Sequence, residues 1–228
     1  MKLVGFGCSF TYGSELIDPN INEWDQHYSN IKYRESHVWL GLLSKRLGCT
    51  FDNRAEPANS NYAIGQQVTE YIRSNQENLA DITICIAWTE RTRMSWYDDH
   101  WTHNGFAGEQ KGWSDSAREW VLKHTSQSLD MFTDNAKLIA NSVCHYYNVP
   151  IIQFNALGKH RSDPYNNYLL NGASMDSYLR RKQEELNRDQ EVLEEVNYFA
   201  SGMHPNERGH EVWTDQLVDW IKGNNLVR

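Results

Sequence analysis

The stretch Val4-Gly5-Phe6-Gly7-Cys8-Ser9-Phe10-Thr11-Tyr12-Gly13 decides the fold of this 228-residue chain. It begins as a short apolar run, typical of a buried strand, and then breaks into glycines and small hydroxyl residues where a helix begins. The carboxyl ends of strands in open α/β sheets face the binding crevice. Ser9 is therefore expected at the rim of a sheet, where its hydroxyl can meet a substrate. The alternative is a turn that only links two elements.

Three further apolar segments predict the other strands of this sheet. They begin at Cys49, run over Asp81–Trp88, and run over Val149–Asn155. The second is apolar on both faces, which is typical of a central parallel strand. Strands that alternate with helices indicate a parallel sheet covered on both sides. Helices are expected at residues 37–48, 62–73, 116–147, 176–196 and 211–221.

Length and composition favour one domain, residues 1–228, with a polar ligand. The chain suffices for one sizeable core, and residues 14–35 and 90–115 are polar, aromatic insertions. A net charge of −8 excludes a nucleic-acid partner, because phosphate binding depends on lysine and arginine.

No apolar run is long enough to span a bilayer. The start leaves no room for a signal peptide, which predicts a cytoplasmic protein with free cysteine thiols.

A serine hydroxyl is a weak nucleophile until a base takes its proton, so Ser9 requires a histidine. The best candidate is His204, in the stretch Ser201-Gly202-Met203-His204-Pro205-Asn206. The proline after it favours a loop that opens a helix. In an α/β fold such a loop can return to the rim where the first strand ends. Ser9 and His204 are thus predicted to meet.

These residues resemble the conserved blocks of the SGNH (GDSL-type) hydrolases. Gly7-Cys8-Ser9-Phe10 resembles the first block of that family, and Ser201–Asn206 resembles the last. Ala55–Asn61 resembles the second block, and Ala87–Glu90 occupies the place of the third. The resemblance implies a flavodoxin-like three-layer α/β/α sandwich with a five-stranded parallel sheet. It also implies a serine esterase of acyl or acetyl esters, often on sugars or lipids, that needs no metal or organic cofactor.

The same resemblance implies a role for each matching residue. Ser9 is the expected nucleophile and His204 the expected general base. The oxyanion would be held by the backbone N–H groups of Ser9 and Ala58, the latter standing where the family has glycine. Thr89 stands where the family has an asparagine donor, and Asn61 is a substitute for that donor. Asn155 is a further substitute.

The acid that normally precedes the histidine by three residues is Ser201 here. Ser201 or a backbone carbonyl could steady the imidazole, because the third member of a triad holds the tautomer and does not carry the proton. Asp163, Asp176 and Glu207 are the other acids considered, and nothing in the local sequence favours any of them.

Several other residues are candidates for substrate contact. Two of them, Trp88 and Asn155, are the last residues of predicted strands, and Arg91 follows the first of these strands. Arg91 and Arg93 could bind an anionic substrate or form ion pairs with nearby acids. The tryptophans at 96, 101 and 113 suit sugar rings or a buried contact equally well. A carbohydrate-borne ester is therefore the favoured substrate class. Compact aromatic chains of this kind also resemble SGNH-like proteins of bacteriophages.

Three competing hypotheses remain open at this point. Cys8 is an alternative nucleophile, although neighbouring residues usually point apart. His100 and His103 with Asp98 and Asp99 lack a defined zinc spacing, which favours a wet surface loop over a metal site. The whole chain could also be a binding or structural module with eroded catalytic residues, because fold alone does not fix function.

Overall fold

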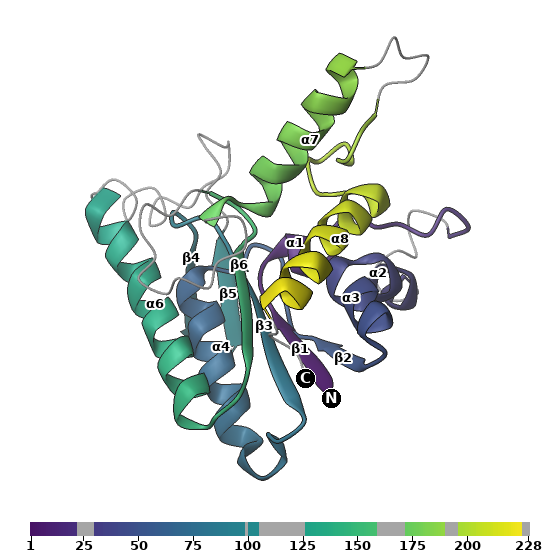
Figure 1. Ribbon diagram of the computed structural model, residues 1–228. Helices are drawn as coiled ribbons and strands as arrows, with labels where there is room; N and C mark the ends of the chain where they lie inside the picture. Colours follow the sequence, from purple (N-terminus) through teal and green to yellow (C-terminus); the bar gives the residue numbers. More distant parts are fainter. Residues whose placement is uncertain (22–29, 99, 105–125, 159–171, 190–195, 225–228) are drawn as a thin grey trace.

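The computed structural model describes residues 1–21, 30–98, 100–104, 126–158, 172–189 and 196–224. At its centre lies a sheet of four parallel strands in the order β2-β1-β3-β6 (Figure 1). The strands are β1 (Lys2–Phe6), β2 (Thr50–Asn53), β3 (Ile82–Trp88) and β6 (Ile151–Asn155). The predicted parallel α/β sheet is confirmed.

The fifth strand implied by the family resemblance is absent from the described residues. Between residues 196 and 206 the chain forms only an isolated bridge, which joins Phe199 to Pro205. It reverses direction between them, with Met203 N–H donating to the Ala200 carbonyl and Ala200 N–H to the His204 carbonyl. Within residues 196–206, this reversal leaves no extended segment that pairs with the sheet.

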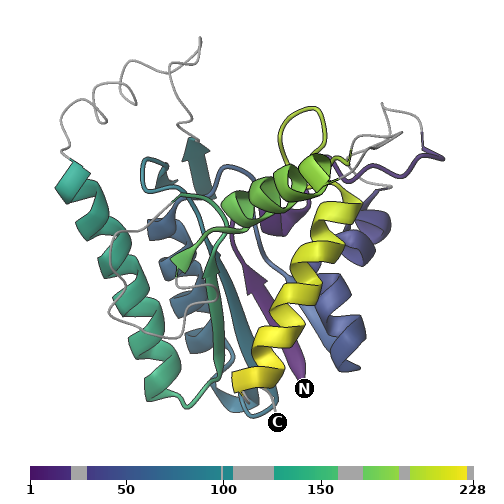
Figure 2. The same cartoon turned by 45° about the horizontal axis from the view of Figure 1, so that its top comes forward.

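Helices cover both faces of the sheet (Figures 1 and 2). Side chains alternate along each strand, so Leu3 joins the core on one face and Val4 the core on the other. The first core contains residues of α3 (Trp39–Leu47), α7 (Met175–Asp189) and α8 (Glu207–Asn224). The second contains residues of α4 (Asn61–Ser74) and α6 (Ser126–Tyr146).

The predicted helices exist, but several of their ends differ from expectation. The helix predicted over 37–48 is α3, which begins at Trp39 because Val38 is extended with ψ 150°. A separate helix, α2 (Ile31–His37), lies before it and begins inside the segment predicted as an insertion. Helix α8 begins at Glu207, four residues before the predicted start. Residues 116–125 and 190–195 of two predicted helices lie outside the described part.

The two insertions are only partly described. The strands β4 (Met94–Asp98) and β5 (His100–Asn104) pair antiparallel, and a 3₁₀ turn covers Gln76–Asn78. Residues 22–29 and 105–125 fall outside. Within the ranges the structure covers, none of the helices is at once long enough and apolar enough to cross a bilayer.

The strand order places the topological switch point of the sheet between β1 and β3. From β1 the chain crosses to β2 on one side, and it then continues to β3 and β6 on the other. Such a reversal is the switch point of an open α/β sheet, where ligands bind at the carboxyl ends of the strands. Helix α1 (Ser9–Tyr12) begins just after β1, and Thr89 follows β3 directly. The first and third family-like blocks therefore share one rim.

His210, on α8, makes the packing of α8 against α3 sensitive to acid. Its side chain is fully buried, and Nδ1 accepts a hydrogen bond from the Trp39 N–H at 3.3 Å. Burial, and secondarily the charge of His204, lower the pKa of His210 from 6.5 to about 3. Within the described part, Nε2 has no partner for the charged form.

We expect the protein to lose stability as the pH falls from about 6.5 toward 3. In that range the unfolded chain protonates His210 and the folded chain does not, so unfolding becomes easier by about 1.4 kcal/mol per pH unit. Chemical unfolding at pH 7, 5.5 and 4.5 measures this slope. His210→Asn keeps an acceptor for Trp39 and should flatten the curve. Parallel curves for the two proteins would contradict the assignment.

Candidate functional site

Ser9 is the first residue of α1, at the crevice end of β1. The helix ends at Gly13, which adopts the left-handed conformation with φ 82°. Two hydrogen bonds to Thr11 fix α1, from Asn53 Nδ2 to its carbonyl at 2.7 Å and from Trp39 Nε1 to its hydroxyl at 3.3 Å. Ser9 is 5% exposed. Cys8 is fully buried in the core below the rim, so its thiol is out of reach of a substrate.

His204 reaches the same rim from the other end of the chain. Its ring packs edge-on against Phe10, the residue after Ser9, with ring centroids 5.8 Å apart. The His204 side chain is 27% exposed. The described residues show no hydrogen bond between the Ser9 hydroxyl and the imidazole. Catalytic hydrogen bonds are often long in the absence of substrate, and they tighten when it binds.

The imidazole is held by a carboxylate that the sequence did not point to, that of Glu15. Nδ1 of His204 lies 2.7 Å from Glu15 Oε2. An ionised carboxylate only accepts hydrogen bonds, so Nδ1 carries the proton in this pair. Neutral imidazole then has Nε2 as its free base. This is the tautomer that a serine nucleophile requires.

Glu15 also organises the backbone of the histidine loop. Oε1 accepts hydrogen bonds from the Gly202 N–H at 2.7 Å and from the Ser201 hydroxyl at 3.4 Å, and Oε2 accepts from the His204 N–H at 3.2 Å. A Cβ atom on Gly202 would lie 2.6 Å from Oε2. A side chain at position 202 would therefore require the Glu15 carboxylate to shift.

The hydrogen bonds keep Glu15 ionised. Partial burial raises its pKa, but the bonds from the His204 side chain and from the Gly202 and His204 N–H groups outweigh this, and the pKa lies below 4.5. Glu15 itself adopts a left-handed backbone, with φ 67°, and the next residue, Leu16, is buried in the core. A non-glycine residue in this conformation is strained and is often found at functional sites.

The acids considered from the sequence lie elsewhere. Asp176 pairs with Arg180, Glu207 accepts from the Tyr33 hydroxyl, and Asp163 falls outside the described residues. Ser201 contacts Glu15 and not the imidazole. Sequence reasoning missed Glu15 because it assigned residues 14–35 to an insertion. The only local signal was an acid two residues after the Gly13 turn.

Two backbone N–H groups are available to hold an oxyanion. Neither the Ser9 N–H nor the Ala58 N–H donates to any residue in the described ranges. Ala58 has φ 61°, the left-handed conformation that favours glycine. The alanine therefore keeps the backbone geometry of the glycine that the family has there.

Replacing Ala58 with glycine should stabilise the protein slightly. A left-handed conformation costs an L-residue about 1–2 kcal/mol, and the greater freedom of glycine in the unfolded chain offsets about 0.5–1 kcal/mol of that. We expect Ala58→Gly to raise the melting temperature by about 1–3 °C in a calorimetric scan. Ala63→Gly, inside α4, should lower it. A lower melting temperature for Ala58→Gly would contradict the observed backbone.

The side-chain oxyanion donors expected from the sequence, Asn61 and Thr89, are buried. Asn61 is 3% exposed, and its amide bridges both backbone groups of Thr89, accepting from the N–H at 2.8 Å and donating to the carbonyl at 3.0 Å. Its Nδ2 also donates to Thr133 Oγ1 at 3.1 Å. The Thr89 hydroxyl is fully buried and unpartnered among the described atoms. Asn61 thus fixes Thr89 instead of facing a substrate.

Two of the expected substrate-contact residues are part of the core. Trp88 is fully buried and donates from Nε1 to Gln153 Oε1 at 3.1 Å. Asn155 is 1% exposed and donates to the Gly172 carbonyl at 3.0 Å. Both are the last residues of their strands, where helices still cover the sheet. They support the rim but cannot touch a ligand.

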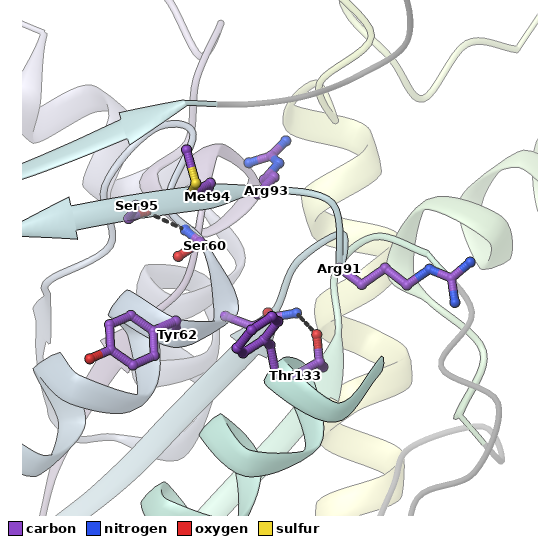
Figure 3. A pocket seen from close by; sticks show the side chains of 9 residues that line it. Ser60, Tyr62, Arg91, Arg93, Met94, Ser95 and Thr133 are labelled. Atoms are coloured by element: carbon purple, nitrogen blue, oxygen red, sulfur yellow. Dashed lines mark hydrogen bonds between the residues drawn. The ribbon is translucent and has the colours of Figure 1, made fainter. Parts of the chain in front are cut away.

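Arg91 remains at the surface of the rim. It lines a pocket beside α4 (Figure 3). It also forms an ion pair with Asp130, whose Oδ1 lies 2.6 Å from Nη1. The other aromatic and metal-binding candidates fall among residues whose side chains lie outside the described part. Residues 99 and 113 lie outside the described part, and the side chains of residues 96–98 and 100–104 are not described.

Comparisons of the fold find related solved structures. An acetyl xylan esterase from the rumen bacterium Butyrivibrio proteoclasticus matches 98% of this chain with a TM-score of 0.53 at 12% identity. The match covers 63% of that chain, so this protein spans less than two thirds of the enzyme's length. Likeness at this level of identity shows a shared fold.

Two further structures cover nearly the full length of both chains. One is a member of the lipolytic protein G-D-S-L family from Veillonella parvula DSM 2008, with a TM-score of 0.46, 14% identity and coverage of 96% of this chain and 97% of that one. The other is the psychrotrophic esterase EstA from Pseudoalteromonas sp., with a TM-score of 0.47, 8% identity and coverage of 97% of each. No protein-family model matches the sequence, and neither does any curated protein.

Proposed function

We propose that this chain, which has the SGNH hydrolase fold, is a single-domain serine esterase with a Ser9–His204–Glu15 catalytic centre. The observation that carries the proposal is the 2.7 Å hydrogen bond between His204 Nδ1 and Glu15 Oε2. It leaves Nε2 unprotonated on a ring that packs beside Phe10, next to Ser9. A base in the correct tautomer next to a rim serine is the arrangement that acyl transfer needs.

The reaction follows from this arrangement. Ser9 Oγ attacks the acyl carbon while His204 Nε2 takes the hydroxyl proton, and Glu15 stabilises the imidazolium that forms. The N–H groups of Ser9 and Ala58 stabilise the oxyanion. The imidazolium then donates its proton to the departing alcohol, which leaves an acyl group on Ser9. Water, deprotonated by Nε2, releases the acid and restores the serine.

The substrate proposed is an acetyl or other short acyl ester, carried on a carbohydrate. The activity named for the Butyrivibrio enzyme is the reason for choosing acetylated xylan fragments as the first substrate. Ser9 and Ala58 provide two backbone donors without a side-chain donor. One lost donor typically costs about 10²–10³ in turnover, so we expect slow hydrolysis.

The test is hydrolysis by the purified chain. Acetate release from acetylated xylo-oligosaccharides and 4-nitrophenolate release from 4-nitrophenyl acetate should both exceed the buffer rate. A serine-directed fluorophosphonate should stop both reactions. If no ester in a panel of acetyl to octanoyl chains is hydrolysed above background, the esterase proposal fails.

One observation favours a second candidate function, a binding module. Asn61 and Thr89, the residues at or beside the family donor positions, are both buried. A protein that binds acetylated xylo-oligosaccharides without releasing acetate would fit that function. Calorimetric titration with the same oligosaccharides distinguishes the two.

A further inference from the structure

A pocket that the proposed reaction does not use lies at the same end of the sheet as Ser9. It has a volume of about 240 Å³ and lies between the first turn of α4, the segment after β3, and α6 (Figure 3). Helices of an α/β sheet begin where the strands end, so this pocket belongs to the crevice side of the molecule. Its lining residues are Ser60, Asn61, Tyr62, Arg91, Arg93, Met94, Ser95, Phe132 and Thr133.

Hydrogen bonds between the three segments fix the pocket in shape. The Ser60 N–H donates to Ser95 Oγ at 3.1 Å, which joins the start of α4 to β4. Asn61 Nδ2 donates to Thr133 Oγ1 at 3.1 Å, which joins the same turn to α6. Figure 3 shows both bonds beside the cavity. A site whose walls are held in this way is organised before a ligand arrives.

Two aromatic side chains border the pocket and are open to solvent. Tyr62 is 51% exposed and Phe132 is 45% exposed. Met94 lines the side of β4. Exposed aromatic and thioether groups around a fixed cavity suit the flat apolar face of a ring.

Of the two arginines that line the pocket, only Arg91 forms an ion pair among the described residues. Arg91 is paired with Asp130, and its side chain points away from Tyr62 and Ser60 (Figure 3). Arg93 has no ion pair in the ranges that the structure covers, and its Nη1 is buried there without a hydrogen bond. A buried donor without an acceptor is unfavourable, most of all on a charged group. Arg93 therefore lines the pocket as a cation without an acid beside it in the described ranges, and an anion bound in the pocket would balance its charge.

We propose that this pocket binds a carboxylate carried on a ring, with the carboxylate at Arg93 and the ring between Tyr62 and Phe132. Guanidinium groups bind carboxylates through paired N–H donors. The ring can be aromatic or a sugar, since both present an apolar face. The proposal goes beyond the esterase function, because binding needs no turnover.

The experiment measures binding to Ser9→Ala, which cannot form an acyl-enzyme. Two pairs of probes are titrated by NMR: 4-hydroxybenzoate against phenol, and glucuronate against glucose. In at least one pair, the acid should bind about tenfold more tightly than its neutral partner, the difference expected for one charge-assisted hydrogen bond. The pair that responds identifies an aromatic or a sugar ring.

Substitutions then locate the binding. Arg93→Gln should abolish the preference for the acid, Arg93→Lys should keep part of it, and Arg73→Gln, an exposed arginine near the end of α4, should leave it unchanged. Equal binding of acid and neutral probe, a preference that survives Arg93→Gln, or no binding at millimolar concentration would each overturn the proposal. Each readout is independent of ester hydrolysis, so the failure of one proposal does not affect the other.

Discussion

His204→Asn should lower kcat/KM for ester hydrolysis by roughly 10⁴–10⁶, the range measured when the base of a serine triad is removed. The substitution removes Nε2 as the base, so the Ser9 hydroxyl keeps its proton. The fold should survive, because the His204 ring is partly exposed and its main partners are Phe10 and Glu15. Initial rates with 4-nitrophenyl acetate measure the loss.

The matched control is His145→Asn, an exposed histidine in the last turn of α6, which should hydrolyse the ester like the wild-type protein. Circular dichroism establishes that both variants are folded. A folded His204→Asn protein that retains more than a tenth of the wild-type rate would mean that another group accepts the proton.

Glu15→Gln should lower kcat by roughly 10³–10⁴ and leave KM nearly unchanged. The amide keeps the shape of the side chain but removes the charge that stabilises imidazolium, and it can donate to Nδ1 and select the wrong tautomer. Losses of this size follow when the acid of a serine triad is neutralised. The rates are compared under saturating ester.

Nitrogen NMR of the His204 ring separates a positioning role from a structural one. In the wild-type protein Nδ1 should carry the proton, as the contact with Glu15 Oε2 requires. In Glu15→Gln the protonated share of Nε2 should increase, and Glu15→Asp should restore part of the activity. If Glu15→Gln has the wild-type tautomer of His204 and the wild-type kcat, Glu15 is not part of the catalytic centre.

The sheet was predictable because its signal is local. Runs such as Asp81–Trp88 are apolar on both faces, and only a parallel strand buried between two helix layers needs that pattern. The absence of a fifth strand from the described residues was not predictable, since the reversal from Phe199 to Pro205 depends on hydrogen bonds within one loop. The break at Val38 has the same origin, because nothing in the apolar spacing marks a single extended residue.

The proposed site could be predicted only at the residues that belong to a sequence motif. Ser9 and His204 could be named from the two ends of the chain, but Glu15 lies 189 residues from His204 in sequence. Its position depends on the left-handed backbone at Gly13 and Glu15, which no periodicity reveals. Trp88 was misassigned because a strand's last residue can still face a helix, as the second core shows.

The most direct test of the account is to locate the covalent adduct of a fluorophosphonate by peptide mass spectrometry. We predict one adduct per chain, on Ser9, formed at wild-type rate in Ser201→Ala, slowly in Glu15→Gln, and not at all in Ser9→Ala or His204→Asn. An adduct on any other residue, or the same labelling after Ser9→Ala, would contradict the claim that Ser9 and His204 form the catalytic centre.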